Sequence, residues 1–416
     1  MENKKILDVV NGEEIGFLEK PYRTKGRESL TEGKGMKEGT LGRKAQFNLI
    51  TRNSERMQGY DERDRVTVEL KDEKGQECVT EVKVKDMKDG TYNVSFYPAV
   101  QGILKLLVKV NEEQTCGSPF TISVKPFHVK PVLCFGEKGT GDGMFDYPRG
   151  VAVTDKDEIV VADQCNNRVQ LFNSNGTFLR SFGHRGKNSG EFNRPDGIAI
   201  DKDGNIFVAD SGNHRVQIFS REGRHLGSFG SIVSLDSKLL EPSGLSLDSN
   251  GNIIVADTGD KLIKIFTPKG RFVMKIGGQG SLTKLRAWIG GQGSFSYLVH
   301  CVPCGEYFIV SDLGEHCIKV FNREGHFQYK FGKEGQGDGE FSYPGYLSVN
   351  ESQHLFVCDR YNHRVQVFEL NGKFIGKFGT EGSKLGEFSK PLSVATLSNG
   401  RIVVSDECNH RIQIFE

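Results

Sequence analysis

One stretch of the chain reads Pro195-Asp-Gly-Ile-Ala-Ile200, Asn205-Ile-Phe-Val-Ala-Asp210, His214-Arg-Val-Gln-Ile-Phe219 and His225-Leu-Gly-Ser-Phe-Gly230. Each run is short and rich in β-branched and aromatic residues, which is typical of a strand. Between the first two runs, Asp201-Lys-Asp-Gly204 predicts a hairpin turn whose glycine has positive φ, and Ser211-Gly-Asn213 predicts a second turn of the same kind. The stretch therefore predicts one small sheet of four antiparallel strands.

The same pattern recurs along the chain. An aspartate ends the second run of each unit, and the intervals between successive aspartates are 47, 47, 55, 47 and 47 residues. These aspartates are Asp163, Asp210, Asp257, Asp312, Asp359 and Asp406. A period of this length with several strands in each unit is typical of a β-propeller, in which every sheet packs against its two neighbours. The repeats therefore predict a six-bladed propeller.

The last repeat indicates how the ring closes. Five units end in a fourth strand that finishes with glycine, but the sixth stops at Phe415-Glu416 after three strands. The segment Val132-Leu-Cys-Phe-Gly136 precedes the first unit and matches the missing strand. We expect residues 132–136 to pair with the last unit and close a propeller of residues 131–416, leaving no open sheet edge at the junction.

The chain before the repeats has a different pattern. Runs of alternating apolar and polar residues occur at 45–50, 66–70, 79–84, 92–97, 103–110 and 120–124, with turn residues between them. This spacing predicts an immunoglobulin-like sandwich over residues 28–127. Residues 1–27 carry mixed charge and are interpreted as a linker or the tail of an upstream region. The predicted fold class is all-β, a sandwich followed by a six-bladed propeller.

Composition excludes several classes of function. The 416 residues carry a formal net charge of +1, which argues against indiscriminate nucleic-acid binding. The sequence shows no apolar stretch near the roughly 20 residues that span a membrane, and its start lacks the hydrophobic segment of a secretory signal. We expect a cytoplasmic protein without a membrane partner, whose nine cysteines stay reduced.

Two features of the fourth repeat are candidates for a catalytic or metal-binding site, and the repeat pattern supports neither. Cys301-Val-Pro-Cys304 has the spacing of a zinc knuckle, but no second pair lies near it, so Cys301 is expected to pack inside the first strand of blade four. His300 is the one histidine among six equivalent first-strand positions, and the other five are aliphatic. A single histidine does not make a set of metal ligands. We expect His300 to be a hydrogen-bonded core residue, and we predict no enzyme activity, no cofactor, no metal and no small-molecule substrate for this chain.

Two sets of motifs resemble known repeats. Asp89-Gly-Thr-Tyr-Asn-Val-Ser-Phe-Tyr-Pro98 and Gly117-Ser-Pro-Phe120 resemble the filamin-type immunoglobulin repeat. The triplets Asn213-His-Arg215, Asn362-His-Arg364 and Asn409-His-Arg411 resemble those of NHL repeats. A filamin repeat followed by six NHL repeats resembles the carboxy-terminal half of the tripartite-motif NHL proteins.

The resemblance implies a function. It indicates a non-catalytic module that recognises a protein target, as in the substrate-recognition half of a RING-type ubiquitin ligase. The catalytic RING of that family is expected outside these residues. The alternative is binding of structured RNA, with post-transcriptional repression, and a structural spacer is a third possibility.

The repeats also predict where a partner binds. In a propeller, the loops that lead into the first strands and the turns between second and third strands open on one face. The candidate binding residues on this face are Arg149, Arg194, His214, Lys261, His316, Arg360, Tyr361, His363, Lys390 and His410. Acidic residues are expected among them, namely Asp196, Glu241, Asp260, Glu315 and Glu407. Arg149, Arg360, Tyr361 and Lys390 are expected to form a basic cluster with an aromatic ring, which suits RNA or an acidic peptide, although an ordinary solvated surface would look the same.

We call the segment between the fourth strand of one blade and the first strand of the next a crossing. The crossing before blade four is eight residues longer than its counterparts. It repeats one hexapeptide, at 276–281 and 289–294, and carries the single tryptophan. Lys284, Arg286 and Trp288 are therefore further candidate binding residues, since such residue types are enriched at binding hot spots. The alternative is a tolerated loop duplication.

Each aspartate lies five residues before the arginine of its own triplet in four of the units, so the two are expected to meet across the turn. Blades three and four lose the triplet and read Asp260-Lys-Leu262 and Glu315-His-Cys317. Drift explains this loss, and a distinct protein-contacting sector is the alternative.

Overall fold

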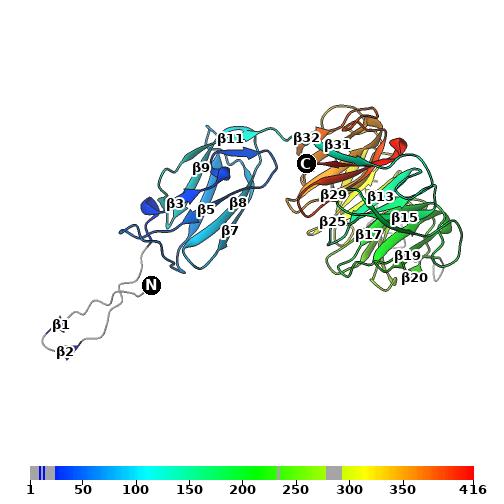
Figure 1. Cartoon of the computed structure of the whole chain (residues 1–416), viewed down its shortest axis with the longest axis horizontal. Helices are drawn as coiled ribbons and strands as arrows, with labels where there is room; N and C mark the ends of the chain where they lie inside the picture. Colours follow the sequence, from blue (N-terminus) through cyan, green and yellow to red (C-terminus); the bar gives the residue numbers. More distant parts are fainter. Residues whose placement is uncertain (1–8, 11–12, 15–23, 232–234, 278–292) are drawn as a thin grey trace, which may run out of the picture. The chain divides into compact units, whose positions relative to one another are not determined.

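The computed structural model describes residues 9–10, 13–14, 24–231, 235–277 and 293–416. It divides the chain into two compact units, Met1–Phe127 and His128–Glu416, whose strands are drawn in Figure 1. The described elements are β-strands and short 3-10 helices, which confirms the all-β class. Among the described residues, no helix has the length and apolar character needed to cross a membrane.

The first unit contains two sheets and a short hairpin. One sheet has the order β3 (Leu30–Glu32), β5 (Ala45–Ile50), β8 (Thr91–Pro98) and β7 (Val79–Asp86). The other has the order β10 (Glu113–Gln114), β9 (Gly102–Val110), β11 (Phe120–Lys125) and β4 (Glu38–Thr40), with β6 (Val66–Lys71) also paired to β9. The hairpin pairs β1 (Val9–Val10) with β2 (Glu13–Glu14). All six strands expected from the alternating pattern are present, and the three-residue strands β3 and β4 were missed because they are too short to show it.

The sandwich buries one side of its strands. In β5 the side chains of Ala45, Phe47 and Leu49 are buried and those between them are exposed, as period-two alternation requires. Together with Phe96 they belong to one apolar core. Thr24 is buried and donates a hydrogen bond to Asp64 at 2.6 Å, so a residue just before position 28 also contacts the sandwich.

The described residues of the second unit form six four-stranded sheets, each strand antiparallel to the next. Blade one consists of β13 (Pro148–Val153), β14 (Ile159–Asp163), β15 (Arg168–Phe172) and β16 (Phe178–Phe182), and blade two of β17 (Pro195–Ile200), β18 (Ile206–Asp210), β19 (Arg215–Phe219) and β20 (His225–Phe229). Blade three consists of β21 (Pro242–Leu247), β22 (Ile253–Asp257), β23 (Leu262–Phe266) and β24 (Phe272–Ile276), and blade four of β25 (Leu298–Cys304), β26 (Tyr307–Asp312), β27 (Cys317–Asn322) and β28 (Phe327–Phe331). Blade five consists of β29 (Pro344–Val349), β30 (His354–Asp359), β31 (Arg364–Glu369) and β32 (Phe374–Phe378), and blade six contains β33 (Pro391–Thr396), β34 (Ile402–Asp406) and β35 (Arg411–Phe415).

A strand from the start of this unit completes blade six. β12 (Pro131–Phe135) pairs antiparallel with β35, with Leu133 opposite Ile414 and Phe135 opposite Ile412. At the centre, β13 contacts both β17 and β33, so the six first strands form a closed ring. In Figure 1 the labelled first strands β13, β17, β25 and β29 lie about the middle of this unit.

Glycine allows the first strands to come close. A Cβ on Gly197 would lie 2.3 Å from the carbonyl oxygen of Ser243 in the next blade, and one on Gly244 would lie 2.5 Å from that of Val299. A side chain at either position would therefore force neighbouring first strands apart. The Pro-x-Gly start of these strands is thus a requirement of packing around the axis.

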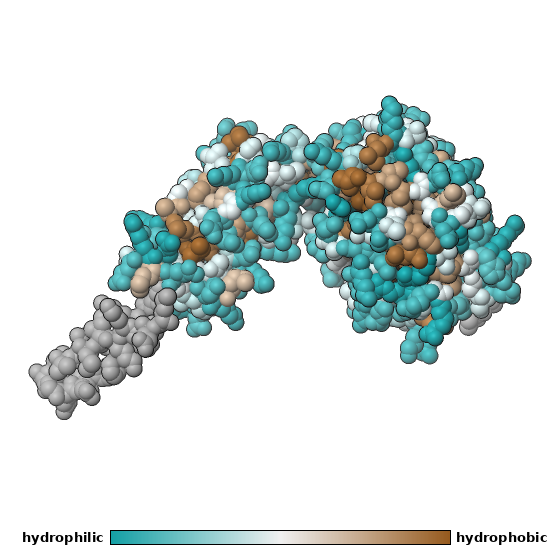
Figure 2. Space-filling view, in the orientation of Figure 1, coloured by the Kyte–Doolittle hydropathy of each residue, from teal (hydrophilic) through white to brown (hydrophobic). Residues whose placement is uncertain are grey.

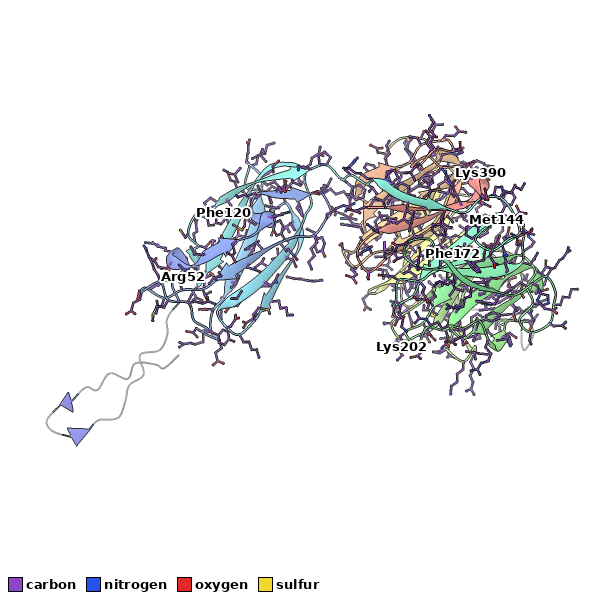
Figure 3. All side chains as sticks on the ribbon, in the orientation of Figure 1. Arg52, Phe120, Met144, Phe172, Lys202 and Lys390 are labelled. Atoms are coloured by element: carbon purple, nitrogen blue, oxygen red, sulfur yellow. The ribbon has the colours of Figure 1, made fainter. Side chains whose placement is uncertain are left out.

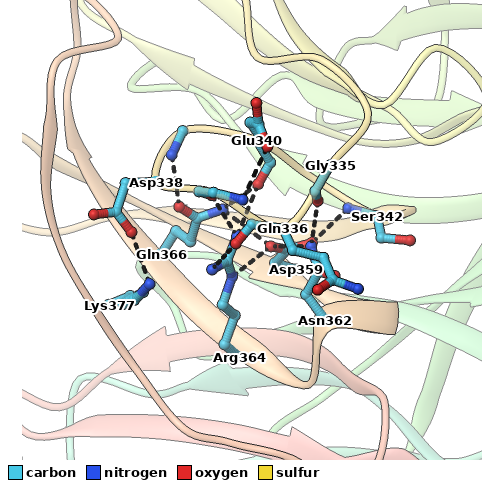
Figure 4. A network of polar contacts seen from close by, with 12 residues as sticks. Gly335, Gln336, Asp338, Glu340, Ser342, Asp359, Asn362, Arg364, Gln366 and Lys377 are labelled. Atoms are coloured by element: carbon cyan, nitrogen blue, oxygen red, sulfur yellow. Dashed lines mark hydrogen bonds and ion pairs between the residues drawn. The ribbon is translucent and has the colours of Figure 1, made fainter.

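Each blade buries a carboxylate, which Figure 4 shows for blade five. Asp359 accepts hydrogen bonds from the Ser342 amide at 2.7 Å, Asn362 at 2.9 Å, Arg364 at 2.7 Å and Gln366 at 3.0 Å. Burial raises the pKa of Asp359, and the hydrogen bonds from Ser342, Asn362 and Arg364 oppose that rise. The predicted contact between each aspartate and its arginine is confirmed, also at Asp163, Asp210 and Asp406.

The same side chains hold the crossing that leads into the blade. Arg364 also donates to the carbonyl groups of Gln336, Gly337 and Glu340, and Asn362 donates to that of Gly335. Triplet and crossing therefore form one hydrogen-bonded unit. The glycine-rich segment that leads into the blade is thus held in place by the triplet.

Blades three and four replace this network with a lysine. Lys264 and Lys319 stand where the other blades have glutamine, and their ammonium groups lie 2.8 Å from Asp257 and Asp312. Lys264 also contacts Asp260, and Lys319 contacts Glu315 at 2.7 Å. The lost arginine is therefore compensated by a buried ammonium group, so the change is a coordinated replacement and not unrelated drift.

One predicted turn is wrong in detail. Gly204 has φ of +82°, as expected, but Ser211–Asn213 is a turn of 3-10 helix and the left-handed residue is His214, with φ of +57°. Gly212 is required for space instead, because a Cβ there would lie 2.5 Å from the side chain of Asn193.

Replacing Arg364 with alanine should lower the free energy of unfolding by about 3–5 kcal/mol, because it leaves the Asp359 carboxylate buried without its cation. Urea denaturation of the whole chain would measure this loss. Arg401→Ala is the matched control, since Arg401 pairs with Glu416 at the surface, where such pairs contribute under about 1 kcal/mol. Equal losses in the two variants would contradict the structural role of the buried pair.

Candidate recognition face

The two sets of loops named above come together in each blade. The turn between second and third strands donates backbone hydrogen bonds to the segment just before the first strand, as from Gly212 to Asn193 and from Tyr361 to Ser342. These loops form one surface of the propeller, which we call the loop face. In Figure 3, Lys390 of this face and Lys202 of a hairpin between first and second strands lie at opposite ends of the propeller.

Aromatic rings and cations alternate on part of the loop face. The His316 and Tyr343 rings lie 4.5 Å apart, and Tyr343 and Tyr361 lie 4.8 Å apart. The Lys390 ammonium group lies 4.6 Å from the centre of the Tyr361 ring. This row, His316–Tyr343–Tyr361–Lys390, spans blades four to six and places a cation beside exposed aromatic surface.

Tyrosines before the first strands were missed by the sequence reasoning. Tyr147, Tyr297 and Tyr343 occupy the position of Arg194 and Lys390, directly before the first strand, and are 38%, 45% and 40% exposed. Tyr147 and Tyr343 have φ of +58° and +54°, a backbone region that a bulky residue rarely adopts. For Tyr147 and Tyr343, the repeated position before proline was the signal that could have identified them.

The histidines of this face hold neighbouring blades together. The backbone N–H groups of Tyr343, Lys390 and Tyr147 donate to Nδ1 of His316, His363 and His410 at 3.2, 3.4 and 3.2 Å. His214 contacts the Leu240 carbonyl group of the next blade. These four predicted binding residues therefore have a structural contact through Nδ1.

The predicted basic cluster is largely neutralised. Arg149 lies 3.0 Å from Asp196 and 2.8 Å from Glu407, and Arg360 lies 2.9 Å from Glu407. Burial acts to lower the pKa of Arg149, but the two carboxylates raise it well above its usual value. The structure brings Arg149, Arg360, Tyr361 and Lys390 together in blades five, six and one, and it gives both arginines an internal partner.

Four of the five acidic residues predicted for the loop face have internal partners, including Asp196 and Glu407. Asp260 and Glu315 contact the buried ammonium groups of Lys264 and Lys319. Among the described residues, no ion pair joins Arg194, Lys261 or Lys390 to a carboxylate, and Glu241 is the one of the five predicted acidic residues without an ion pair. The loop face thus presents cations beside tyrosines although the whole chain is nearly neutral. Lys284, Arg286 and Trp288 lie outside the described residues.

The axis of the propeller contains a cluster of buried polar side chains. The Tyr346 hydroxyl donates to Asp196 at 2.8 Å, and the Tyr346 ring stacks on His300 at 4.6 Å. His300 is buried, lies 3.2 Å from the Leu245 carbonyl oxygen through Nε2, and accepts from the Leu347 N–H at 3.3 Å. The prediction of a hydrogen-bonded core histidine is confirmed.

Cys301 and Cys304 are buried in β25, as the packing interpretation expected. Burial raises the pKa of the Cys301 thiol far above its usual range. Within the described residues, no three His, Cys, Asp or Glu side chains gather in a way that could hold a metal ion.

Comparison with known proteins identifies the repeats. The Filamin/ABP280 repeat family matches residues 24–121. The NHL repeat family matches residues 145–172, 192–219, 239–266, 341–368 and 388–415. Blade four, whose sheet is complete in the structure, has no match among these five.

Several curated proteins are similar over part of the chain. The E3 ubiquitin-protein ligase TRIM71 of Xenopus tropicalis is 36% identical over 151 residues, which cover 35% of this chain and 18% of that protein. Protein lin-41 of Caenorhabditis elegans is 34% identical over 106 residues, covering 24% of this chain and 9% of that protein. The matches thus span less than a fifth of either relative.

Solved structures support the fold alone. A protein of unknown function from Bacteroides thetaiotaomicron aligns with a TM-score of 0.60 at 16% identity, covering 95% of this chain and 98% of that chain. A gluconolactonase from Xanthomonas campestris aligns with a TM-score of 0.51 at 13% identity, covering 70% of this chain and 97% of that chain.

The buried histidine should make stability depend on pH. Burial lowers the pKa of His300 to about 4, below the unperturbed value of about 6.5. Above about pH 6.5 the imidazole is neutral in both the folded and the unfolded chain. Below about pH 6.5 the unfolded chain binds a proton before the folded chain does. The free energy of unfolding should therefore fall as the pH drops towards 4. Urea denaturation between pH 7 and pH 4.5 should show a shallower decline in His300→Gln than in the parent chain. Identical slopes would contradict the neutral buried imidazole.

Proposed function

The chain belongs to the tripartite-motif NHL family, whose filamin and NHL repeats it carries, and from this premise we propose that it is a recognition module that binds a protein target through its loop face. The proposal assigns no catalysis to these residues. It places ubiquitylation, the activity named for the TRIM71 relatives, in a catalytic region outside them, with this chain selecting the target. We also propose the cytoplasm as its compartment, supported by cysteines that are all free thiols.

The observation that carries the proposal is the row of rings and cations on blades four to six. Tyr343 and Tyr361 are 40% and 43% exposed, and Lys390 lies against the second ring. Tyrosine is enriched at the energetic centre of protein interfaces because it buries a large rigid ring and keeps a polar hydroxyl. Since Asp196, Glu407 and Glu315 are engaged internally, the charge left for a partner on this row is positive. We infer a target segment that carries acidic residues.

A second candidate is structured RNA. Exposed aromatic rings stack on bases, and lysine and arginine contact phosphates, so the same row and Arg194 also suit an RNA loop. Net charge argued against RNA in the sequence, but the internal pairing of acidic residues weakens that argument. The two candidates differ in their dependence on salt, because contacts to several phosphates release condensed counterions.

Tyr361→Ala and Lys390→Ala should each weaken target binding about tenfold, because they remove a central ring or its adjacent cation. The probes are acidic peptides selected on the intact chain from a random peptide library, with affinity measured by fluorescence anisotropy. Tyr307→Ala is the matched control, because Tyr307 is equally exposed, at 43%, but lies outside the loop face. Loss of affinity only in the control would refute the proposed surface.

The same variants should be tested by electrophoretic shift with a pool of structured RNAs at two salt concentrations. If the protein target is correct, no shift is expected at micromolar protein. A shift that falls steeply with salt and disappears in Tyr361→Ala, together with failure to select any acidic peptide, would replace the protein target with RNA.

A further inference from the structure

A hydrogen bond crosses the axis of the propeller near the loop face, and a cavity lies beyond it. Tyr346 of blade five donates to Asp196 of blade two, and Ser243 of blade three lies 3.2 Å from the same carboxylate. Blades two and five are opposite each other in a ring of six, so this hydrogen bond crosses the axis. Tyr346 also lines the cavity described next.

Below this bridge lies a cavity of about 300 Å³. It is lined by the second halves of all six first strands, mostly by valine, isoleucine, leucine and alanine. First strands run away from the loop face, so the cavity belongs to the opposite end of the propeller. Five apolar side chains at its mouth are half-buried, one from each of blades one to five: Val153, Ile200, Leu247, Pro303 and Val349.

Acidic residues surround this mouth. The hairpins that follow the first strands, at 154–158, 201–205, 248–252, 304–307, 350–354 and 397–401, contain eight acidic and three basic side chains. Asp201 and Asp248 directly follow Ile200 and Leu247 of the apolar mouth. Asp155 and Glu158 pair with Arg221, and Arg401 pairs with Glu416.

Six acidic side chains of these hairpins make no ion pair with any described residue: Asp157, Asp201, Asp203, Asp248, Glu306 and Glu351. Their local contacts are hydrogen bonds that leave the charge in place, as where Asp201 accepts from the amides of Asp203 and Asn205. The inner hairpins around the cavity therefore place an acidic margin next to an apolar centre, while the outer hairpins of the same end carry cations such as Arg224, Lys269 and Arg271.

We propose that this end of the propeller is a second docking surface, for a basic peptide segment that inserts a bulky apolar side chain into the axial cavity. The cavity is at the lower limit of ligand pockets, about 300 Å³, which suits a single anchoring side chain. The acidic hairpins extend over five blades around it, so complementary charge requires lysine or arginine on both sides of the anchor. Charge complementarity selects this partner over an acidic or neutral one.

The proposal is independent of the function assigned to the loop face, and the test keeps the two apart. The probe is a fluorescein-labelled synthetic peptide with a central phenylalanine flanked by lysines, and anisotropy is measured with the full chain at low and moderate salt. We expect binding that weakens about tenfold when the phenylalanine is replaced by serine. A peptide with glutamate in place of lysine should not bind.

Variants locate the site. Asp203→Lys with Glu351→Lys should weaken binding about tenfold at low salt, and Ile200→Ser with Leu247→Ser should weaken it at both salt concentrations. Glu222→Lys with Glu324→Lys is the matched control, since these two exposed residues lie in outer hairpins at the same end, and it should leave affinity unchanged. Thermal unfolding of each variant verifies folding, and Tyr361→Ala should bind the probe normally.

Three results would overturn the proposal. The first is equal binding by the parent chain and the Asp203→Lys/Glu351→Lys variant. The second is loss of the probe in Tyr361→Ala, which would place it on the loop face. The third is a change of oligomeric state in Ile200→Ser/Leu247→Ser without a change in probe affinity, which would assign the apolar mouth to a second copy of the chain.

Discussion

The pairing of β12 with β35 is the constraint on which the rest of the propeller depends. Each blade is a thin sheet that buries both faces only when it has a neighbour on each side. Blade six receives its fourth strand from residues that precede blade one, and Phe135 of that strand packs 4.9 Å from Phe172 of blade one. Closure thus brings blades six and one together, and Arg149, Glu407 and Arg360 can meet although Arg149 and Glu407 are far apart in sequence.

Internal electrostatics determine what each end of the propeller offers to a partner. Every described blade buries an aspartate and matches it with arginine and glutamine or with lysine. At the loop face the acidic side chains are also used internally, by Arg149, Arg360, Lys264 and Lys319, which leaves cations beside tyrosines. At the other end, several carboxylates keep their charge around an apolar opening. On the face in view, Figure 2 shows a mainly hydrophilic surface with apolar residues gathered in patches.

The repeat period and the strand pattern were enough to predict the architecture from sequence. The spacing of Asp163 to Asp406 predicts six blades because each aspartate performs the same task in its own blade. The site was harder, since contacts such as Arg149–Glu407 and Tyr346–Asp196 join different blades and depend on radial geometry. Asp196 and Glu407 therefore read as surface acids in the sequence, and nothing in the sequence indicated that the Nδ1 atoms of His316, His363 and His410 join adjacent blades. The replacement of arginine and glutamine by Lys264 and Lys319 was visible in the sequence once the whole network, and not the triplet alone, was compared.

Hydrogen exchange of β35 tests ring closure most directly. If Leu133, Cys134 and Phe135 are replaced by Gly-Ser-Gly, β12 loses the side chains that pack against blade one and its pairing with Arg411–Phe415 weakens. The account predicts that the β35 amides lose protection, that exchange also rises in β13 and β33, and that the melting temperature falls by several degrees. Unchanged protection of β35 and an unchanged melting temperature would contradict closure by this strand, and with it the arrangement of both proposed surfaces.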